Sequence, residues 1–513
     1  MRNSMKSKTF LFGGILAAVL TILTFQSCKK SRSDIGKMLF QETRNKVFKK
    51  IEADPFIEVF KQTLEEHRSK LRNPKLITAF YEGNDYDPVL LMQHVPKENL
   101  KLFAEKLNGT GAHGLAPEMF DGPRYSELVG KLYEKKGIKT VDEAYKVLAE
   151  LEIMTANSLI NYSNALQYGV ISPRKIYARY YTETKRPDSA SMMAALQVND
   201  LKTYLDSIQP KSPGYLKLQE ALTSGAVAPG MTPEETQRVI EVNLERLRWQ
   251  NRKEAEKMVV VNIPDFRLDV LENGKSVLNM KVCVGEGREV NLDELREYDE
   301  DDLKKDRPFS RETPQLGSLI HSVQVNPVWN IPQSIATNEI SKHAAADRYY
   351  LSNNNIDVYK DGQLVEDTEL IDWSAGDAGK VYSFKQRPGD DNSLGRIKFL
   401  FNNESSVYLH DTPAKAAFKL SNRAVSHGCV RVEKPLELAH ALFGDGKKYE
   451  IIKSEMAVTE NQQATDLALP KKVPVYLTYA TCWADESGTV QFRNDVYGLD
   501  VVLYSYLTKL KGI

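Results

Sequence analysis

The stretch KMVVVNIPDFRLDVLENGKSVLNMKVCVGEG, residues 257–287, decides the fold class. It contains short runs rich in Val, bounded by turn residues, and this pattern is typical of β-strands. Asn273-Gly274 separates two of the runs, and this dipeptide is a strong signal for a tight hairpin turn. Further strand candidates follow in SVQVNPVWNI, GRIKFLF, SVYLH and CVRV, and VPVYLTYATCWADESGTVQF predicts another hairpin, turning at Asp485–Gly488. The C-terminal half is therefore predicted to be predominantly β.

The half before this stretch has a different periodicity. Residues 33–71 and 142–169 place apolar residues at intervals of three and four among many charges, which is typical of amphipathic helices. Gly169 is a plausible helix stop, with Pro173 shortly beyond. Thr232, Pro233 and Glu235 form the signature of a capped helix start. Residues 29–250 are therefore predicted to be all-α.

The 513 residues are too many for one compact core, so we expect an α+β protein of several domains. Helical residues 29–250 would be followed by a β sandwich or barrel over residues 256–455. Residues 456–513 would form a C-terminal hairpin and a tail that packs on the body.

Composition excludes several classes of function. Lys+Arg and Asp+Glu balance at 69 each, so no global basic field indicates nucleic acid. Four cysteines are too few for a disulfide scaffold. No cluster of His, Cys and carboxylates has metal-ligand spacing, so we expect no metal and no other cofactor.

The N-terminus resembles an export signal. A short basic segment, MRNSMKSK, precedes the apolar run TFLFGGILAAVLTILTF, which is rather short for a membrane span. Ser27 directly precedes Cys28, as in bacterial lipoprotein signals, so residues 1–28 are predicted to be a signal peptide with Cys28 lipidated. An uncleaved anchor and simple secretion are the alternatives. In each case the body of the protein would lie outside the cytoplasm.

Residues 408–431, YLHDTPAKAAFKLSNRAVSHGCVR, carry the candidate chemistry. Cys429 is a candidate nucleophile, because a thiolate can form beside an imidazole that takes its proton. We favour His410 as the base, since a loop can bring its strand beside Cys429, and His427 as support. Backbone N–H groups around Gly428 could stabilise an oxyanion, and Arg431 could bind a carboxylate. An isolated Cys in a β-rich segment is more often a core residue, but the combination of His, Gly and Cys favours catalysis.

This arrangement resembles the signature of L,D-transpeptidases with a YkuD-type catalytic domain, in which an upstream His accompanies Ser/Thr-His-Gly-Cys. His410, Ser426, His427, Gly428 and Cys429 match it. VVNIPDFRLDV, TPQLGSLIHSVQVNPVWNIPQSI, RPGDDNSLGRIKF and PVYLTYATCWADESGTVQFRNDVYG are similar to blocks of the large, YcbB-like subgroup. NGTGAHGLAPEMF and TANSLINYSNALQYGVISP are similar to its scaffold domain.

The resemblance implies an enzyme that cross-links bacterial peptidoglycan. Cys429 would attack the third residue of a tetrapeptide stem, D-alanine would leave, and an amine of a second stem would attack the thioester to give a 3→3 cross-link. His410 would move the protons. A carbapenem would be expected to acylate Cys429.

The resemblance also implies a substrate-binding region. A capping element over residues 328–356 would cover the site. Substrate contacts are expected from the residues Arg431, Ser426, Asn392, Trp329 and Tyr408, with packing as the alternative for Trp329 and for Trp373. The subgroup often carries a small peptidoglycan-binding insert near the end of its helical part, and this sequence has no room for one.

Several alternatives stay open at this stage. The same thioester could pass to water in a carboxypeptidase or endopeptidase, to free D-amino acids, or to a protein Lys, because pocket shape chooses the acceptor. A further alternative is not an enzyme: a lipid-anchored protein that binds the cell wall and has an inactive site. The expected partners are peptidoglycan stems, the membrane through its lipid anchor and possible cell-wall synthases, in the periplasm-facing envelope of a Gram-negative-type bacterium. A bond between Cys283 and Cys482 is possible outside the cytoplasm.

Overall fold

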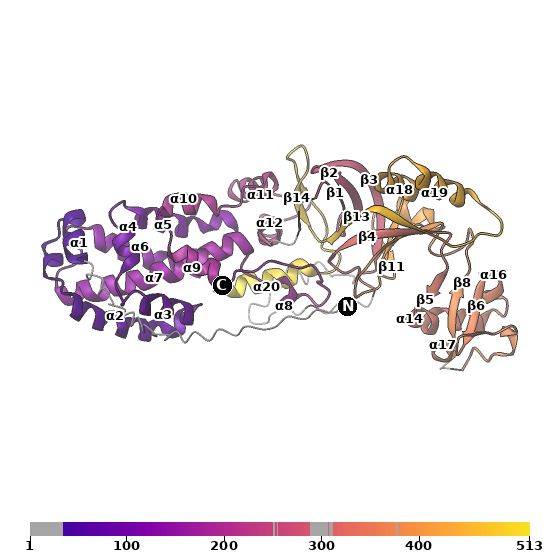
Figure 1. The fold of residues 1–513 in the computed structure, drawn as a ribbon, viewed down its shortest axis with the longest axis horizontal. Coiled ribbons are helices and arrows are strands. Elements are labelled where there is room, and N and C mark those ends of the chain that lie inside the picture. The colour runs from indigo at the N-terminus through magenta and orange to yellow at the C-terminus, as the bar shows by residue number, and fades with distance from the viewer. Residues whose placement is uncertain are drawn as a thin grey trace, which may run out of the picture.

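The computed structural model describes residues 34–249, 252–253, 255–287, 306, 311–375 and 378–512. The molecule is elongated, with a helical part at one end, a large sheet beside it and a small mixed unit at the other end (Figure 1). The predicted class, a helical N-terminal part followed by a β-rich part, is confirmed. Each of the three parts has its own apolar core.

The helical part is built around α7 (Val141–Tyr168), a helix of 28 residues that is buried along most of its length. The Thr140 side chain caps its start by accepting the Glu143 N–H, and Gly169 ends it with a φ of 73°. The predicted capping box of Thr232 and Glu235 is present at the start of α12. The other elements are α1 (Ile35–Thr43), η1 (Lys46–Lys50), α2 (Ala53–His67), η2 (Arg68–Lys70), α3 (Pro74–Glu82), α4 (Val89–His94), α5 (Asn99–Asn108), η3 (Gly109–His113), η4 (Pro117–Phe120), α6 (Gly122–Tyr133), α8 (Pro173–Ile176), α9 (Ser189–Leu196), α10 (Leu201–Ser207), α11 (Pro213–Thr223) and α12 (Pro233–Arg248).

The large sheet has nine strands in the order β11-β3-β12-β10-β9-β4-β13-β1-β2. An additional pairing of β2 with β3 closes this order on itself, with β11 outside the ring. Asn273 and Gly274 both have positive φ and turn β2 into β3, as predicted. The strands are β1 (Lys257–Asn262), β2 (Arg267–Glu272), β3 (Lys275–Gly285), β4 (Leu316–Val325), β9 (Ile397–Phe401), β10 (Leu409–His410), β11 (Ala424–Ser426), β12 (Val430–Val432) and β13 (Thr465–Thr478), accompanied by η7 (Lys415–Lys419), α18 (Pro435–Phe443) and α19 (Lys447–Ala457).

The C-terminal segment differs from the expectation. Only β14 (Cys482–Ala484) and β15 (Val490–Phe492) pair as a hairpin, turned at Asp485–Gly488. The preceding residues form the second half of β13, which lies between β4 and β1. They join the sheet because Val473, Val475 and Leu477 alternate with polar or less buried residues and reach its core. The chain then ends in the helix α20 (Leu499–Lys511).

The capping element expected over residues 328–356 is part of a larger folded unit. Residues 329–386, here called the cap unit, form a sheet in the order β5-β8-β6-β7 with its own core. The unit extends beyond residue 356 because β8 pairs with both β5 and β6. Its elements are β5 (Trp329–Ile331), α14 (Gln333–Ile335), the π-helical turn η5 (Ala336–Ile340), α15 (Ser341–Ala346), α16 (Tyr350–Asn353), β6 (Ile356–Lys360), β7 (Gln363–Leu364), η6 (Thr368–Leu370), α17 (Ala378–Val381) and β8 (Ser383–Gln386).

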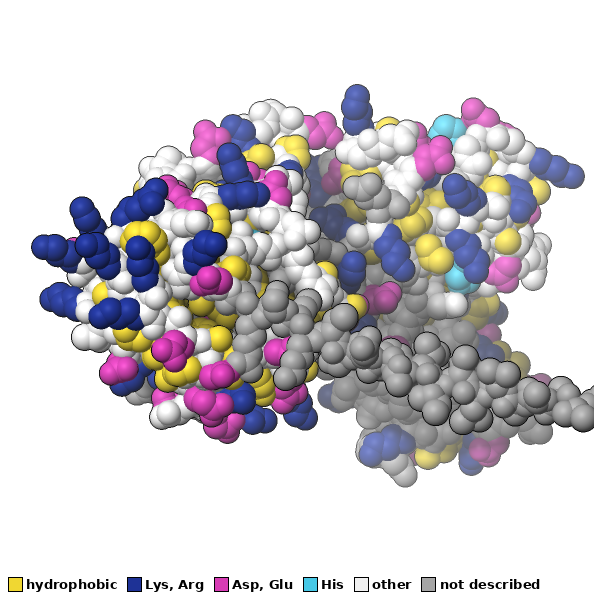
Figure 2. Space-filling view, turned by 60° about the vertical axis from the view of Figure 1, so that its left-hand side comes forward, with side chains coloured by type: hydrophobic (Ala, Val, Ile, Leu, Met, Phe, Trp, Pro, Cys, Tyr) yellow, Lys and Arg dark blue, Asp and Glu magenta, His cyan; other side chains and the backbone are white. Residues whose placement is uncertain are grey.

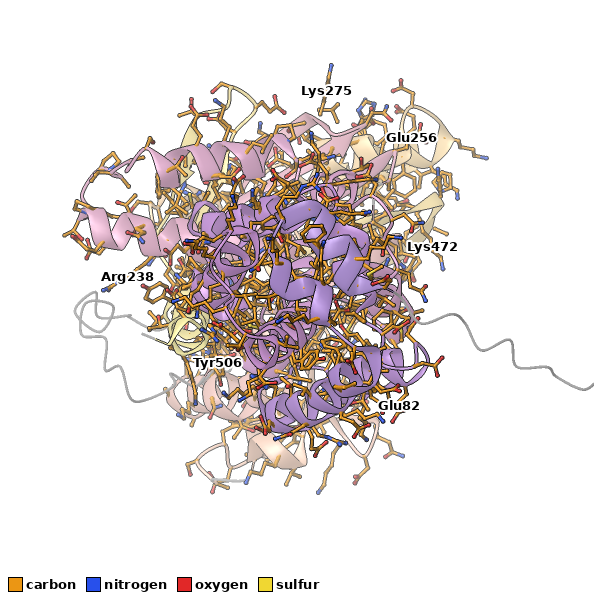
Figure 3. All side chains as sticks on the ribbon, turned by 90° about the vertical axis from the view of Figure 1, so that its left-hand side faces the viewer. Glu82, Arg238, Glu256, Lys275, Lys472 and Tyr506 are labelled. Carbon is orange, nitrogen blue, oxygen red and sulfur yellow. The ribbon has the colours of Figure 1, made fainter. Side chains whose placement is uncertain are left out.

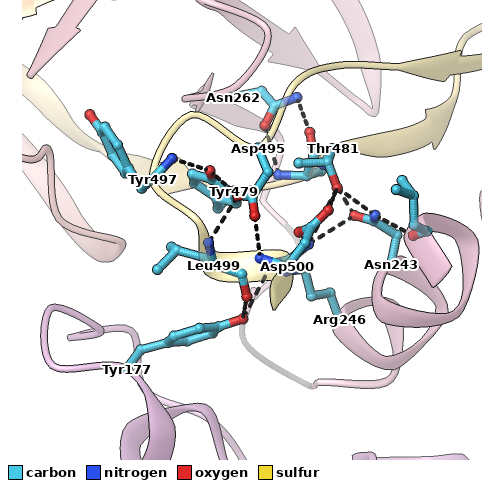
Figure 4. A network of polar contacts seen from close by, with 12 residues as sticks. Tyr177, Asn243, Arg246, Asn262, Tyr479, Thr481, Asp495, Tyr497, Leu499 and Asp500 are labelled. Carbon is cyan, nitrogen blue, oxygen red and sulfur yellow. Dashed lines mark hydrogen bonds and ion pairs between the residues drawn. The ribbon is translucent and has the colours of Figure 1, made fainter. Parts of the chain in front are cut away.

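A buried polar network joins the helical part to the sheet (Figure 4). Arg246 of α12 donates to Asp500 of α20 at 2.5 Å, and both side chains are less than 10% exposed. Asp500 also accepts from Thr481 at 2.6 Å, and Thr481 accepts from Asn243 at 2.7 Å. This junction therefore consists of an ion pair whose remaining hydrogen-bonding groups are largely paired as well.

The surface is charged and mixed. Figure 2 shows Lys and Arg side chains gathering on the forward, helical end of the molecule. In the end-on view of Figure 3, Lys275 projects away from the body at the β2–β3 turn, where it is exposed. Among the helices in the described residues, none is both long and apolar enough to cross a membrane. The predicted signal peptide and Cys28 lie outside the described residues.

Candidate active site

One row of polar residues crosses six strands of the large sheet. Strand register places Asp466 opposite Gln324, Gln324 opposite Lys398, and Lys398 opposite His410. The row continues from His410 to Arg431 and from Arg431 to Cys283. Residues opposite each other on neighbouring strands point to the same face. The row and the site that it carries therefore lie on one face of the sheet.

The neighbouring row belongs to the opposite face. Val323, Phe399, Leu409 and Val430 are opposite one another in the same register and are all fully buried. They form part of the apolar core of the sheet. The period-two alternation of these short strands thus separates the core face from the face that carries His410 and Arg431.

Cys429 is presented by a tight turn between β11 and β12. The Ser426 hydroxyl donates to the Cys429 carbonyl at 2.6 Å and accepts the Gly428 N–H at 3.2 Å. Thr313 donates to the Gly428 carbonyl at 2.8 Å. Gly428 has a φ of 114°, a conformation that side chains other than glycine rarely adopt. The Ser-His-Gly-Cys sequence therefore builds a turn that only glycine allows, with the thiol just before a strand.

This geometry corrects two of the sequence-based assignments. Ser426 is 1% exposed and its hydroxyl is used within the turn, so it is a structural residue rather than a substrate contact. The Gly428 N–H is bonded to Ser426, so it is not free for an oxyanion in this conformation. The N–H groups of His427 and Cys429 are the remaining candidates from this turn.

The Cys429 thiol lies among polar groups of the same face. Burial raises its pKa to about 11, while hydrogen bonds from the backbone and hydroxyl of Tyr408, and then the charges of Arg431 and Lys398, act in the opposite direction. Burial and the nearby Cys429 also raise the pKa of the Tyr408 phenol. The free site therefore holds a neutral thiol at neutral pH, with Tyr408 beside it.

His410 is buried on β10, with an exposure of 4%. Burial lowers its pKa to about 4, and the charge of Arg431 lowers it further. Its Nδ1 faces the backbone carbonyl of Asp411, so the neutral ring carries its proton on Nδ1 and keeps a lone pair on Nε2. The ring also packs edge-on against Tyr408, with centroids 5.6 Å apart. A neutral imidazole with a lone pair on Nε2 can accept a proton and can therefore act as a base.

His427 does not share this environment. Its Nε2 lies 2.7 Å from Oε1 of Glu339, which belongs to η5 of the cap unit. The same oxygen accepts from Arg311 at 2.6 Å, and Arg311 also pairs with Glu286 at 3.1 Å. The structure thus gives His427 a contact with the cap unit, and the supporting role expected for it stays a prediction.

The other expected substrate residues are distributed differently. Tyr408 and Arg431 lie on the polar face, as described above. Asn392 is 1% exposed, and its amide donates to backbone carbonyls, including that of Arg387 at 2.9 Å, and accepts the Leu394 N–H. Asn392 therefore shapes the loop before β9 and does not offer a group to substrate. Trp329 and Trp373 are partly buried against the core of the cap unit, which is the packing alternative.

Sequence reasoning missed two residues of this region, Lys398 and Glu339. Lys398 interrupts the apolar strand IKFLF, and a charged residue at that position was the available signal. Glu339 carries no signal, because its contact with His427 joins segments 88 residues apart.

Cys283 and Cys482 are both buried and unbonded, Cys283 on the large sheet and Cys482 in a small core with α11 and α12. Among the described residues, no group of His, Cys, Asp and Glu could hold a metal ion.

Two models of known protein families match parts of this chain. Residues 256–445 match the model of the L,D-transpeptidase catalytic domain, YkuD, and residues 75–222 match the model of a scaffold domain. The chain is 27% identical over 328 residues to a Haemophilus influenzae protein named "Putative L,D-transpeptidase". This match covers 63% of the chain and 61% of that relative's length. The chain therefore combines a region similar to the YkuD L,D-transpeptidase catalytic domain, residues 256–445, with a region similar to a scaffold domain, residues 75–222, which is a YcbB-like architecture.

Proposed function

We propose that this protein is an L,D-transpeptidase that forms 3→3 cross-links in peptidoglycan through a thioester on Cys429. The observation that carries the proposal is the position of Cys429. It lies at the end of a glycine-dependent turn, directly before a strand paired with that of His410, and beside Tyr408. The match to the YkuD catalytic domain supports the same reaction class.

The first half of the reaction uses the neutral thiol and imidazole. His410 takes the thiol proton as sulfur attacks the carbonyl carbon of the third residue of the donor stem. The oxyanion collapses, the bond to the nitrogen of the terminal D-alanine breaks, and His410 returns the proton to that leaving amine. Tyr408 stabilises the transient thiolate by donating a hydrogen bond.

The second half transfers the acyl group. The side-chain amine of the third residue of a neighbouring stem attacks the thioester carbon and loses a proton to His410. The carbon–sulfur bond then breaks, and His410 reprotonates the departing sulfur. The product is an amide between two third residues, and Cys429 is again a thiol.

Placement outside the cytoplasm belongs to the same proposal. The signal-like residues 1–28 and Cys28 would place the enzyme in the periplasm-facing envelope as a lipid-anchored protein, where its substrate lies. An anchor would also keep the enzyme near the wall without a dedicated wall-binding insert.

The test is intact mass spectrometry of residues 33–513 and of its Cys429→Ala variant. Each protein is incubated with a carbapenem and, separately, with a disaccharide tetrapeptide. We expect an adduct on Cys429 and dimeric 3→3 muropeptide from the unchanged protein, and neither from the variant. Shortened peptide without dimer would replace the proposal with a hydrolase. An adduct without turnover of peptide, or no adduct on a folded protein, would contradict it.

A further inference from the structure

Two cations beside His410, Lys398 and Arg431, form no ion pair with any carboxylate that the structure describes. Lys398 and Arg431 lie opposite His410 on the two neighbouring strands, so they flank it on the same face of the sheet. Within the described part of the chain, neither forms an ion pair, and Nε of Arg431 is buried without a hydrogen-bond partner. The acid of the row, Asp466, accepts from Gln324 at 3.0 Å and acts on Lys398 only through its charge, from two strands away.

A half-buried cation without a counter-ion is unfavourable, and two of them beside one imidazole are more so. Lys398 is only partly exposed, and burial lowers its pKa. Its ammonium also lies 5.7 Å from the ring centroid of Tyr408, the residue beside the thiol, and its charge acts on Cys429. This arrangement is costly for the free protein and indicates a site that receives an anion.

The donor stem of the proposed reaction brings such an anion to the right place. Its terminal D-alanine ends in a carboxylate, and the scissile carbonyl is one peptide unit away, about 3.8 Å along the chain. A carboxylate held near Lys398 would therefore place that carbonyl close to Cys429, whose thiolate both Lys398 and Arg431 influence.

We propose that Lys398 is a specificity-determining residue of this site, which binds the terminal carboxylate of the donor stem peptide together with Arg431. The inference rests on the proposed function and deepens it by naming the part of the substrate that is recognised. It also explains why a charged residue interrupts the apolar strand β9. The enzyme would thereby choose stems with a free terminal carboxylate.

The experiment compares a tetrapeptide stem with the same peptide ending in a carboxamide. Binding is measured by calorimetry with the Cys429→Ala protein, so that no turnover is needed, and thioester formation is measured with Cys429 present. We expect Lys398→Met to weaken binding of the acid by about tenfold or more while leaving the amide unchanged. Lys398→Arg should retain part of the preference, because the charge is kept.

Lys385→Met is the matched control, since Lys385 is a half-buried lysine on a strand of the cap unit. Equal affinity of the unchanged protein for acid and amide, or an equal loss of both in Lys398→Met, would overturn the proposal. If Lys398→Met loses the preference for the acid over the amide, but the protein with Cys429 forms no thioester, the carboxylate site is supported and the transpeptidase reaction is rejected. The two failures are therefore distinguishable.

Discussion

At the scale of single residues, the site depends on whether each polar side chain binds the backbone around it or is available to a substrate. Ser426 and Asn392 were expected at the substrate, and both instead bind backbone groups of their own loops. The sequence motif predicts a turn that needs glycine, and Gly428 has a φ of 114°. The motif does not predict whether a hydroxyl or amide side chain bonds the backbone of its own loop, because those bonds depend on the three-dimensional shape of the loop.

Tyr408 is expected to control the reactivity of the thiol. Tyr408→Phe removes the hydroxyl that stabilises the thiolate, so the pKa of Cys429 should rise above its value of about 11. Loss of one hydrogen bond to a charged group corresponds to roughly one pKa unit or more. Alkylation of Cys429 by iodoacetamide should therefore be about tenfold slower at pH 8. An unchanged alkylation rate would show that the hydroxyl does not act on the sulfur.

At the scale of elements, the sequence predicts turns and helix caps better than it predicts the pairing of distant strands. The turn at Asn273-Gly274 and the capped start of α12 follow from a few neighbouring residues and were predicted correctly. The extent of the cap unit was not, because β8 completes its sheet from a position well beyond the predicted segment. Pairings of this kind depend on contacts between distant segments, which local periodicity does not encode.

The contact of Glu339 with His427 should hold the cap unit against the site. Glu339→Gln keeps the shape of the side chain and removes the charge shared by His427 and Arg311. We expect a bulky maleimide to label Cys429 several-fold faster, because the cap unit would open more often. Glu369→Gln is the control, since Glu369 pairs with Arg348 in an exposed ion pair elsewhere in the cap unit. Equal labelling of both variants would contradict this role of Glu339.

Two buried histidines of the helical part should make it sensitive to acid. Burial lowers the pKa of both His94 and His113 to about 4. The unfolded chain binds these protons below pH ~6.5, while the folded chain binds them only near pH ~4. The stability of the folded chain should therefore be unaffected by these two histidines above pH ~6.5. The free energy of unfolding should fall as the pH drops from ~6.5 toward ~4. Thermal unfolding at several pH values measures the effect.

Substitution of each ring separates their roles. Among the described residues, His94 has no hydrogen-bond partner for either ring nitrogen, whereas Nδ1 of His113 is hydrogen-bonded to the Tyr215 hydroxyl at 2.9 Å. His94→Leu should keep or raise the melting temperature at pH 7 and reduce the loss in acid. His113→Leu should lower stability at pH 7 by about 1–3 kcal/mol, because Tyr215 loses a buried partner. A lower melting temperature for His94→Leu at pH 7 would show that its ring is satisfied.

At the scale of the whole molecule, the helical part and the sheet are joined by buried charges. Asp500→Asn would remove the carboxylate that pairs directly with buried Arg246 and leave only the more distant Asp495, so we expect a loss of about 3–5 kcal/mol in the free energy of unfolding. Asp206→Asn, which breaks the exposed pair with Lys106, should cost less than about 1 kcal/mol. Denaturant unfolding of both variants compares them. Similar small losses would mean that the junction tolerates an unpaired Arg246.

The position of β13 has a consequence for how the protein is made. The strand pairs with β1 in parallel and with β4, so residues 465–478 insert between strands that were synthesised well before them. A ribosome releases the chain from its N-terminus, and helical segments with local contacts can fold as they emerge. The ring of strands cannot close until residues 465–478 have left the ribosome. Translation that stops shortly after residue 445 would thus yield every residue of the polar turn around Cys429 but no closed sheet to hold it.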